Sequence, residues 1–296
     1  MTLFKTYRHV AMLLLTLFSL LFASVTFADA DSKTKQVNLP TGVKLSYVES
    51  GAKTAPVIIF LHGATDSSHS WSSTTPYLNG QYHTYALDQR GHGNSDKPPY
   101  GYSVAQFAED VIAFMDREKI NKAVIVGHSM GSLVAHQIAS VYPSRVSKLV
   151  LVGSAATAHG NAVILDLWRT VVGKAEFVDP IDPAFIEAWQ TGPNPVEPVF
   201  FNKVLSETAK VPARVWKNIF RMLETDNHTY FLKDITAPAM VIWGTQDPIF
   251  SQADQDALIA ALPTGAQFVP FSGAGHNVQW EQPQQVATAI QTFLAQ

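Results

Sequence analysis

Runs of consecutive apolar residues recur along the chain and predict strands that are buried on both faces. Four such runs are Val57–Leu61, Ala123–Val126, Leu149–Val152 and Met240–Trp243. A strand covered on both faces has apolar side chains at nearly every position, whereas a half-buried strand alternates apolar with polar residues. Val43–Glu49 shows that alternation, and a further strand is predicted at Gln267–Phe271.

Apolar residues at helical spacing separate these predicted strands. After Ser103 an apolar stripe follows at three- and four-residue intervals, with Gln106 placed to complete a capping box. The other predicted helices are Ser132–Tyr142, which stops at Pro143, residues 251–262 and Pro283–Leu294. Strands that alternate with helices indicate crossover connections, so we expect an α/β fold with a mostly parallel central sheet flanked by helices.

The alternation is interrupted between residues 155 and 233. Prolines divide this segment into short helical pieces that are rich in aromatic residues, namely Trp168, Phe185, Trp189, Phe200, Phe201, Trp216 and Phe220. We interpret residues 155–233 as a helical cap inserted between two parts of a core, residues 31–154 and 234–296.

The N-terminus has the pattern of a secretory signal peptide. Lys5 and Arg8 precede an apolar stretch from Val10 to Phe22, and Ala28-Asp29-Ala30 offers small residues where a signal peptidase cuts. We therefore expect residues 1–30 to be removed and the protein to be exported, to the periplasm or the medium, with no stable membrane insertion. An uncleaved anchor is the alternative, although the apolar stretch is short for spanning hydrocarbon of about 30 Å.

Composition narrows the function classes. The chain is 47% hydrophobic and 15% charged, which is ordinary for a globular protein. Its net charge of -3 comes without a long basic run, so nucleic acid is not an expected partner. The absence of cysteine from the sequence rules out disulfides and a thiol nucleophile.

Gly127-His128-Ser129-Met130-Gly131 has the form of a nucleophile elbow. It follows the predicted strand Ala123–Val126 directly and precedes a helix, which is the context that this motif requires. The two glycines let strand, turn and helix approach one another closely, while Ser129 takes a strained conformation that exposes its hydroxyl. Ser129 is therefore the candidate nucleophile.

A serine hydroxyl needs a base, and the base needs an orienting acid. Asp247 follows the predicted strand Met240–Trp243, and His276 follows the next predicted strand. Catalytic groups of open α/β sheets gather at the carboxyl ends of the strands, so we expect both to meet Ser129 there. Asp254 and Asp256 compete for the acid role, but they fall inside the following helix.

An oxyanion needs backbone donors, and the chain offers two. Met130 follows the nucleophile, and Ala64 follows the predicted strand that ends in Leu61-His62-Gly63. We interpret His62 as structural. His62, His69 and His128 have no carboxylate or cysteine at ligand spacing, so no metal site is predicted.

These motifs together resemble the α/β-hydrolase fold family over the whole mature chain, in the branch of bacterial esterases, lactonases, haloperoxidases, dehalogenases and epoxide hydrolases. Residues 88–95 are similar to the family's D-x-R-G-x-G-x-S segment, and Glu281-Gln282-Pro283 also fits. Asp88 and Arg90 are interpreted as structural. In this family dehalogenases and epoxide hydrolases use an aspartate nucleophile, and epoxide opening relies on paired cap tyrosines. Ser129 and the single cap residue Tyr230 therefore disfavour both activities.

The aromatic cap favours an apolar cavity over the elbow, although most of its rings are expected to form its own core. The residues expected to line that cavity are Trp71, Trp168, Trp189 and Ile249, with Met130 beside them. We therefore expect a serine hydrolase that cleaves a small to medium neutral carboxylic ester without a cofactor. The alternatives are lactone opening, including acyl-homoserine lactones, carbon-carbon bond hydrolysis, and cofactor-free haloperoxidase or perhydrolase activity. A more distant alternative is a non-catalytic ligand-binding protein, and the oligomeric state is not predicted.

Overall fold

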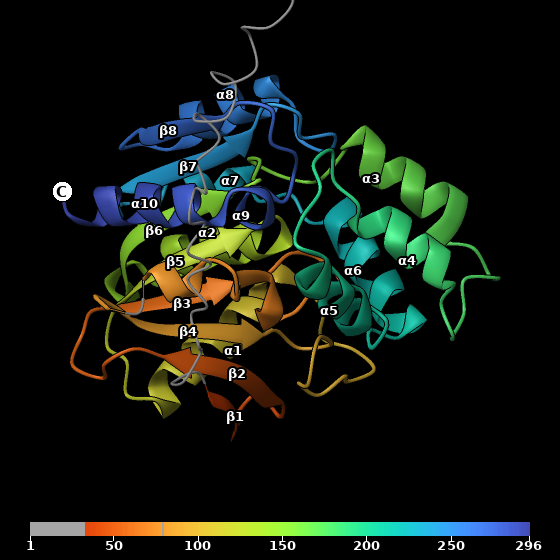
Figure 1. Ribbon diagram of the computed structural model, residues 1–296, viewed down its shortest axis with the longest axis horizontal. Helices are drawn as coiled ribbons and strands as arrows, with labels where there is room; N and C mark the ends of the chain where they lie inside the picture. The colour runs from red at the N-terminus through yellow and green to blue at the C-terminus, as the bar shows by residue number, and fades with distance from the viewer. Residues whose placement is uncertain (1–32, 79) are drawn as a thin grey trace, which may run out of the picture. The chain divides into compact units, whose positions relative to one another are not determined.

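Eight strands form one sheet in the part of the chain that the structure describes, residues 33–78 and 80–296 of a computed structural model (Figure 1). The strands are β1 (Lys33–Asn38), β2 (Lys44–Ser50), β3 (Val57–Leu61), β4 (His83–Asp88), β5 (Ala123–His128), β6 (Val146–Val152), β7 (Ala239–Gly244) and β8 (Ala266–Phe271). The expected signal peptide, residues 1–30, lies outside the described residues.

The sheet order is β1-β2-β4-β3-β5-β6-β7-β8. β2 pairs antiparallel with β1 and with β4, and every other neighbouring pair is parallel. The prediction of a mostly parallel sheet is therefore confirmed. Because parallel strands end at the same edge, the loops that follow β3, β5, β7 and β8 meet there.

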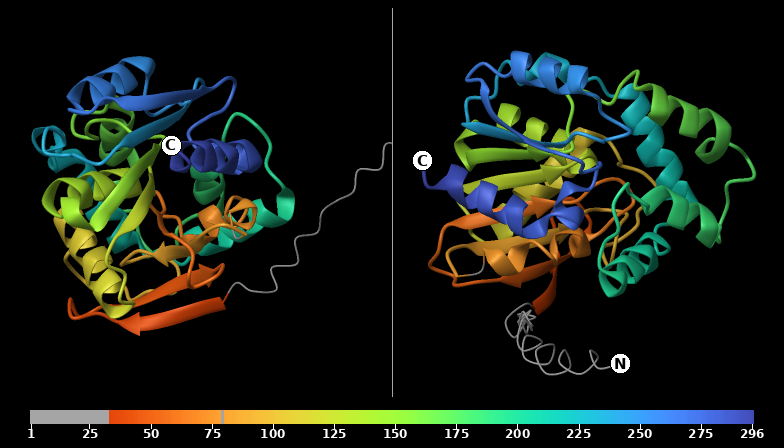
Figure 2. Two further views of the ribbon diagram at one scale, coloured as in Figure 1. Left: turned by 90° about the vertical axis from the view of Figure 1, so that its left-hand side faces the viewer. Right: turned by 45° about the horizontal axis from the view of Figure 1, so that its top comes forward.

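Helices cover both faces of the sheet, which explains the continuous apolar runs. Along β3, Ile59 and Leu61 belong to one core cluster, while Ile58 and Phe60 belong to the cluster on the opposite face. The first face is covered by α1 (Val104–Arg117), α2 (Met130–Val141) and α8 (Gln252–Ala261), and the second by α9 (Val278–Glu281) and α10 (Pro283–Leu294) (Figure 2).

The segment between β6 and β7 is helical, as predicted from its prolines and aromatic residues. It contains α3 (Ala162–Leu167), the π-helical turn η4 (Trp168–Val172), α4 (Pro183–Gln190), α5 (Pro198–Thr208), α6 (Ala213–Thr225) and α7 (Thr229–Leu232). Trp189, Trp216 and Phe220 form ring contacts with centroids 5.4–5.9 Å apart. We call the helices α3 to α6 the cap, and its aromatic residues mainly form its own core.

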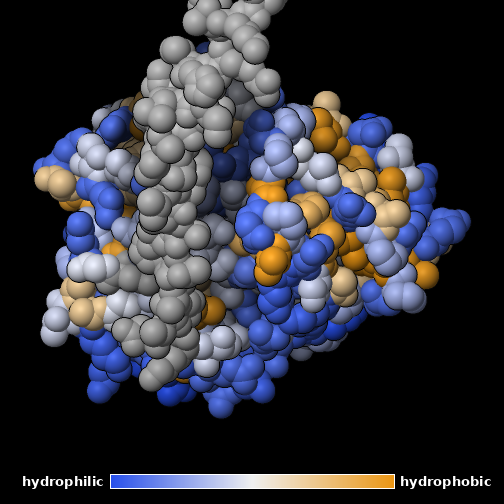
Figure 3. All heavy atoms as spheres, viewed as in Figure 1, coloured by the Kyte–Doolittle hydropathy of each residue, from blue (hydrophilic) through white to orange (hydrophobic). Residues whose placement is uncertain are grey.

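Apolar residues also gather on the outer surface over the cap helices (Figure 3). Val163 and Val199, in the first turns of α3 and α5, are among the large exposed apolar residues. Within the described residues no helix is both long enough and apolar enough to cross a membrane.

Two local expectations need correction. The Ser103 hydroxyl accepts a hydrogen bond from the Gln106 amide, but the Gln106 side chain turns to Glu109 instead of completing the capping box. A complete capping box lies at the start of α8, where Ser251 and Asp254 satisfy each other's backbone amides. The second predicted helix begins at Met130 rather than Ser132, because the turn at Ser129 leads directly into it.

Candidate active site

Ser129 lies in the sharp turn between β5 and α2. Its backbone angles, φ 50° and ψ -119°, fall in a region that non-glycine residues rarely occupy. The turn is held because the Ser129 amide donates to the Val152 carbonyl at 3.0 Å. At Gly127 a Cβ atom would lie 2.4 Å from the Gly131 carbonyl oxygen, so no larger residue fits. The close approach expected of this motif is therefore present.

His276 and Asp247 meet at the same edge of the sheet. The His276 Nδ1 atom lies 2.8 Å from Asp247 Oδ2, and the Asp247 side chain is completely buried. The other carboxylate oxygen accepts hydrogen bonds from the amides of Ile249 and Phe250 at 2.8 and 3.1 Å. With three donors around it, this carboxylate is fixed as an acceptor, which makes Nδ1 the protonated ring nitrogen of His276.

The other ring nitrogen of His276, Nε2, is buried and has no hydrogen-bond partner among the described residues. His276 and Ser129 line the same cavity, and no hydrogen bond joins them in this structure. The arrangement leaves the acceptor nitrogen of His276 unpaired in the wall that it shares with Ser129. Asp254 instead caps α8, so the geometry selects Asp247 as the partner of His276.

His128, the second residue of the elbow, holds His276 from its other side. Its Nε2 atom donates to the His276 carbonyl oxygen at 3.1 Å, and the two rings lie 4.9 Å apart. Burial lowers the pKa of His128 well below its ordinary value, so the ring is neutral. From the sequence His128 was a candidate only as a metal ligand, and the local pattern gives no sign of this contact.

The loop that follows β3 is held by two neutral histidines. His62 Nε2 accepts from the Gln89 amide at 3.0 Å, and His92 Nε2 accepts from the Thr65 amide at 3.1 Å. Burial lowers the pKa of His62 to about 4, and it also lowers the pKa of His92. His62 is therefore structural, as expected, and these bonds position Ala64 at the cavity wall.

The backbone amides of Ala64 and Met130, the two expected oxyanion donors, both belong to segments next to Ser129. Ala64 lines the cavity that contains Ser129, and Met130 is the first residue of α2. The first amides of a helix have no acceptor within the helix, so the Met130 amide is available to a ligand. The Met130 side chain, however, is buried in the core and does not line the cavity.

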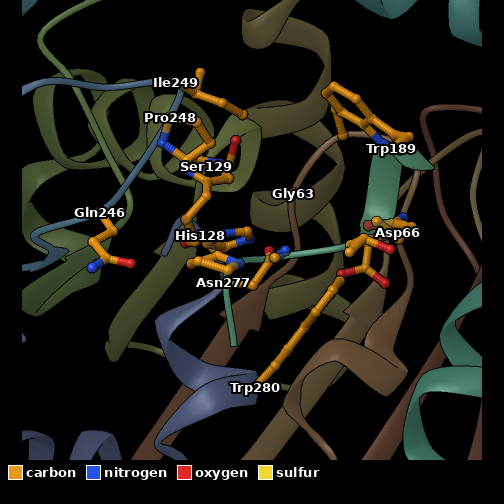
Figure 4. Close-up of a pocket in the computed structure, with 16 residues that line it drawn as sticks. Gly63, Asp66, His128, Ser129, Trp189, Gln246, Pro248, Ile249, Asn277 and Trp280 are labelled. Carbon is orange, nitrogen blue, oxygen red and sulfur yellow. Dashed lines mark hydrogen bonds between the residues drawn. The ribbon is translucent and has the colours of Figure 1, made fainter. Parts of the chain in front are cut away.

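The cavity has a volume of about 310 Å³ and opens between the elbow and the cap (Figure 4). Its lining includes Trp189 and Ile249, as predicted. Figure 4 shows Pro248 and Ile249 beside Ser129, and Trp189 across the cavity from them.

The expectations for Trp71 and Trp168 are wrong. Trp71 is completely buried and packs against Phe60, with ring centroids 4.9 Å apart, because its short helix turns it to the opposite face of the sheet. Trp168 begins η4 and lies with its ring against Gly173, away from the cavity.

A carboxylate joins the His276 loop to the cap. Both Glu281 oxygens accept from the Gly275 amide, at 3.0 and 3.1 Å, and Asn194 also donates to Glu281. A Cβ atom at Gly275 would lie 2.3 Å from Pro193 Cδ, so loop and cap are in close contact. In the sequence Glu281 stands out only as part of the segment Glu281-Gln282-Pro283.

Asp88 and Arg90 support the loops below the cavity. Asp88 accepts from the amides of Ser68 and Asn94, and Arg90 forms a buried two-point ion pair with Asp110. Neither residue lines the cavity, so both fit the structural role that was expected. Among the described residues no cluster of three or more histidine, aspartate or glutamate side chains is arranged to hold a metal ion.

Known proteins resemble this chain in sequence and in fold. A relative named 3-oxoadipate enol-lactonase 2, from Acinetobacter baylyi, is 28% identical over 256 residues, which cover 85% of this chain and 93% of the relative. A relative named epoxide hydrolase A, from Mycobacterium tuberculosis, is 26% identical over an alignment that covers 86% of this chain and 94% of the relative. A crystal structure described as a membrane phospholipase A, a bacterial virulence factor, has a TM-score of 0.79 at 25% identity. The match covers 90% of this chain and 86% of that structure's chain.

The family comparison covers most of the chain. The model described as alpha/beta hydrolase fold matches residues 56–283, a range that contains the elbow, Asp247 and His276. With the sheet order and the turn at Ser129, this match shows that the chain belongs to the α/β hydrolase fold family.

Proposed function

We propose that this protein is a serine hydrolase that cleaves small to medium neutral carboxylic esters through an acyl-enzyme. The observation that carries the proposal is the His276 ring, which is bonded to buried Asp247 at 2.8 Å, lines the same cavity as Ser129 and has an Nε2 without a hydrogen-bond partner among the described residues. This is the relation between base, acid and nucleophile that acyl transfer requires.

In the proposed mechanism Ser129 Oγ attacks the ester carbonyl while His276 Nε2 takes the hydroxyl proton. The amides of Ala64 and Met130 stabilise the oxyanion, and Asp247 stabilises the imidazolium that forms. His276 then protonates the departing alcohol. A water molecule, activated by His276, hydrolyses the acyl-enzyme and regenerates Ser129.

The cavity supports a neutral substrate of limited size. Trp189, Pro248, Ile249 and Trp280 give it apolar walls, and among the described residues that line it there is no lysine or arginine to pair with an anionic substrate. A second cavity of about 380 Å³ lies beyond the loop of residues 190–193, which lines both.

The test is turnover of a series of aryl esters of increasing acyl length by the wild type and by Ser129→Ala. We expect the variant to lose a factor of about 10⁴ or more in kcat. A fluorophosphonate probe should label the wild type and leave the variant unlabelled. Turnover of the variant near that of the wild type would refute the assignment, and an unlabelled wild type would favour a binding protein.

Lactone opening is the second candidate, because a relative with 28% identity is named an enol-lactonase. The same three residues would open a ring ester by the same steps. Lactones assayed beside the open-chain esters distinguish the two proposals, since activity confined to lactones would overturn the ester proposal. Epoxide opening is disfavoured because Ser129 stands where an aspartate would be needed and Tyr230 is 73% exposed.

We also propose that the protein is exported, on the basis of Lys5, Arg8 and the apolar stretch that follows them. Expression of the full chain in a bacterial host, followed by cell fractionation and N-terminal sequencing, tests this. Intact protein that starts at Met1 in the cytoplasm would contradict export.

A further inference from the structure

Thr65 lies next to the proposed oxyanion donor Ala64 and has a strained backbone. Its φ of 65° falls in the left-handed region, which β-branched residues rarely occupy. The residue is completely buried. Strain of this kind persists only where the surroundings enforce it, and it is frequent at functional sites. The contacts that enforce the conformation of Thr65 therefore also determine where Ala64 lies.

Contacts with the core fix the peptide groups on both sides of Ala64. The Gly63 carbonyl accepts from His62 Nδ1 at 2.7 Å, and because C=O and N–H point in opposite directions in a trans peptide, the Ala64 N–H points away from buried His62. In the next peptide the Thr65 amide donates to His92 Nε2 at 3.1 Å. The Thr65 hydroxyl donates to the Ala64 carbonyl at 2.6 Å, so the direction of Ala64 depends on Thr65.

A further bond to Thr65 comes from the cap. The indole of Trp189, in the last turn of α4, donates to the Thr65 hydroxyl at 2.9 Å. Figure 4 shows the Trp189 ring next to the loop that continues from Gly63. The ring is itself held by Trp216 and Phe220, whose centroids lie 5.9 and 5.4 Å from it. The Thr65 hydroxyl thus has a partner for its proton and a donor to its oxygen.

We propose that Trp189 is a positioning residue through which the cap holds the oxyanion donor in place, because its indole orients Thr65 and Thr65 orients the Ala64 amide. The inference rests on the proposed function, and it gives the cap a part in the chemical step besides enclosing the substrate. Oxyanion stabilisation depends on donors that are fixed before the charge forms. A small displacement of the Ala64 amide therefore slows the chemical step, while binding of the uncharged ester stays nearly the same.

Two roles of Trp189 have to be separated, because its ring also lines the cavity. A wall contributes equally to binding of the ester and of the transition state, so its loss raises KM. A positioning bond contributes only as the charge develops, so its loss lowers kcat. Thr65 does not line the cavity, so a substitution there removes the bond without changing the wall.

The experiment measures kcat and KM for an aryl ester in variants that remove the bond from either side. Trp189→Phe keeps an aromatic wall but loses the N–H donor, and Thr65→Val keeps the branched side chain but loses the hydroxyl. We expect each to lower kcat by about tenfold or more, with a change in KM of less than about threefold. The double variant should be about as slow as Thr65→Val, because that change already removes the bond from Trp189.

Two further variants are controls. Thr65→Ser retains the hydroxyl and should retain most of kcat. Trp216→Phe is the same exchange in the same aromatic cluster, but the Trp216 indole nitrogen has no hydrogen-bond partner among the described residues, and its ring does not line the cavity. It should keep the wild-type kcat even where lost packing lowers its free energy of unfolding. Urea unfolding of every variant establishes that it is folded under the assay conditions.

Binding of a trifluoromethyl ketone gives a readout that a purely structural role would not move. Ser129 Oγ adds to its carbonyl carbon, the hydroxyl proton passes to His276 Nε2, and the electron pair of the carbonyl double bond moves to the oxygen, which becomes the oxyanion. The affinity of Trp189→Phe and Thr65→Val for this inhibitor should fall by about tenfold or more. A simple alcohol forms no oxyanion and should inhibit Thr65→Val as strongly as the wild type.

The outcomes separate the two proposals. A wild-type kcat in Trp189→Phe, a change confined to KM, or an equal loss in Trp216→Phe would overturn the positioning role and leave ester hydrolysis intact. The same conclusion follows if Thr65→Ser is as slow as Thr65→Val, or if the ketone binds both bond-removing variants as tightly as the wild type. A wild type that hydrolyses no ester and resists the fluorophosphonate probe would overturn both proposals.

Discussion

Asp247 is fixed as an acceptor by the three donors around its carboxylate. Asp247→Asn would place an amide there. Its oxygen would turn to the amides of Ile249 and Phe250, and its NH₂ group would face His276 Nδ1. The histidine would then be held in the wrong tautomer, with Nε2 protonated and unable to accept the Ser129 proton. We expect kcat/KM for esters to fall by about 10³–10⁴.

The measurement is kcat/KM with an activated aryl ester, together with the rate of fluorophosphonate labelling, which should fall in parallel. Asp254→Asn serves as the control with an unchanged catalytic rate, because the Asp254 carboxylate accepts from the Ser251 amide outside the cavity. A decrease of less than about tenfold in Asp247→Asn would argue that another acid orients His276.

Asp66 gives a pH dependence of stability with an unusual sign. Burial raises its pKa to about 7 in the folded protein, above an ordinary value near 3.8, so the folded state holds a proton that the unfolded state has lost. Stability from this group is therefore present below about pH 4 and is lost as the pH rises to about 7, by an amount on the order of a few kcal/mol.

Asp66→Asn cannot ionise, so the difference in unfolding free energy between the variant and the wild type isolates this group. We expect that difference to change in favour of the variant between pH 5 and pH 8, on the order of a few kcal/mol. Urea unfolding at both pH values measures it. A pH-independent difference would show that the carboxylate ionises normally.

Residues that follow strands could be placed from the sequence, whereas side-chain directions could not. Asp247 and His276 each come directly after a strand, so topology alone brings them to one edge. Trp71 is close to Ala64 in sequence, yet a short helix turns it to the far face of the sheet. Asp66 gave no signal, because its raised pKa results from burial that only the three-dimensional structure reveals.

At the scale of elements, Glu281 links the end of α9, the His276 loop and the cap segment that contains Asn194. Glu281→Gln retains one acceptor but loses the charge and presents an NH₂ group to the donors of Gly275 and Asn194. The loop that contains Gly275 and His276 should become more mobile, so that a smaller fraction of molecules has His276 in the catalytic position. We therefore expect kcat to fall by about tenfold with a smaller change in KM.

Steady-state kinetics of Glu281→Gln, with its rate of fluorophosphonate labelling, checks this positioning role. Glu187→Gln, on the exposed side of α4, is the control and should match the wild type. If Glu281→Gln lowered the free energy of unfolding but left kcat unchanged, the contact would serve stability alone.

The strands show which signals the sequence carries. β3 and β5 were predicted from continuous apolar runs. These strands need apolar residues at every position because helices cover both faces of the sheet. β4 was missed because it begins with His83 and Thr84, two polar residues where a buried strand usually has apolar ones. In the structure His83 is buried beside Glu49, which lies 2.8 Å from it and comes from the neighbouring strand β2. Pairing between distant segments is not visible in a local pattern.

At the scale of the whole molecule, buried neutral histidines set the response to acid. His62, His92, His128 and His136 are all buried, and burial lowers the pKa of each. In the unfolded chain a histidine titrates near pH 6.5. As the pH falls below that value, these histidines bind protons in the unfolded state but stay neutral in the folded state, so the free energy of unfolding decreases. This pH dependence is opposite in direction to that of Asp66.

His136 is the sharpest test, because neither of its ring nitrogens has a hydrogen-bond partner among the described residues and its pKa is lowered to about 3. Its share of stability is complete above about pH 6.5 and is lost as the pH falls toward 3, at up to about 1.4 kcal/mol per pH unit. His136→Leu removes this share, so its free energy of unfolding should fall less steeply between pH 6.5 and 4.5. Urea unfolding at several pH values measures the slopes, with His159→Leu, an exposed position, as the control that keeps the wild-type slope. Parallel slopes for His136→Leu and the wild type would mean that His136 is protonated in the folded state, and a charged residue buried under the sheet would then need a partner that this fold does not supply.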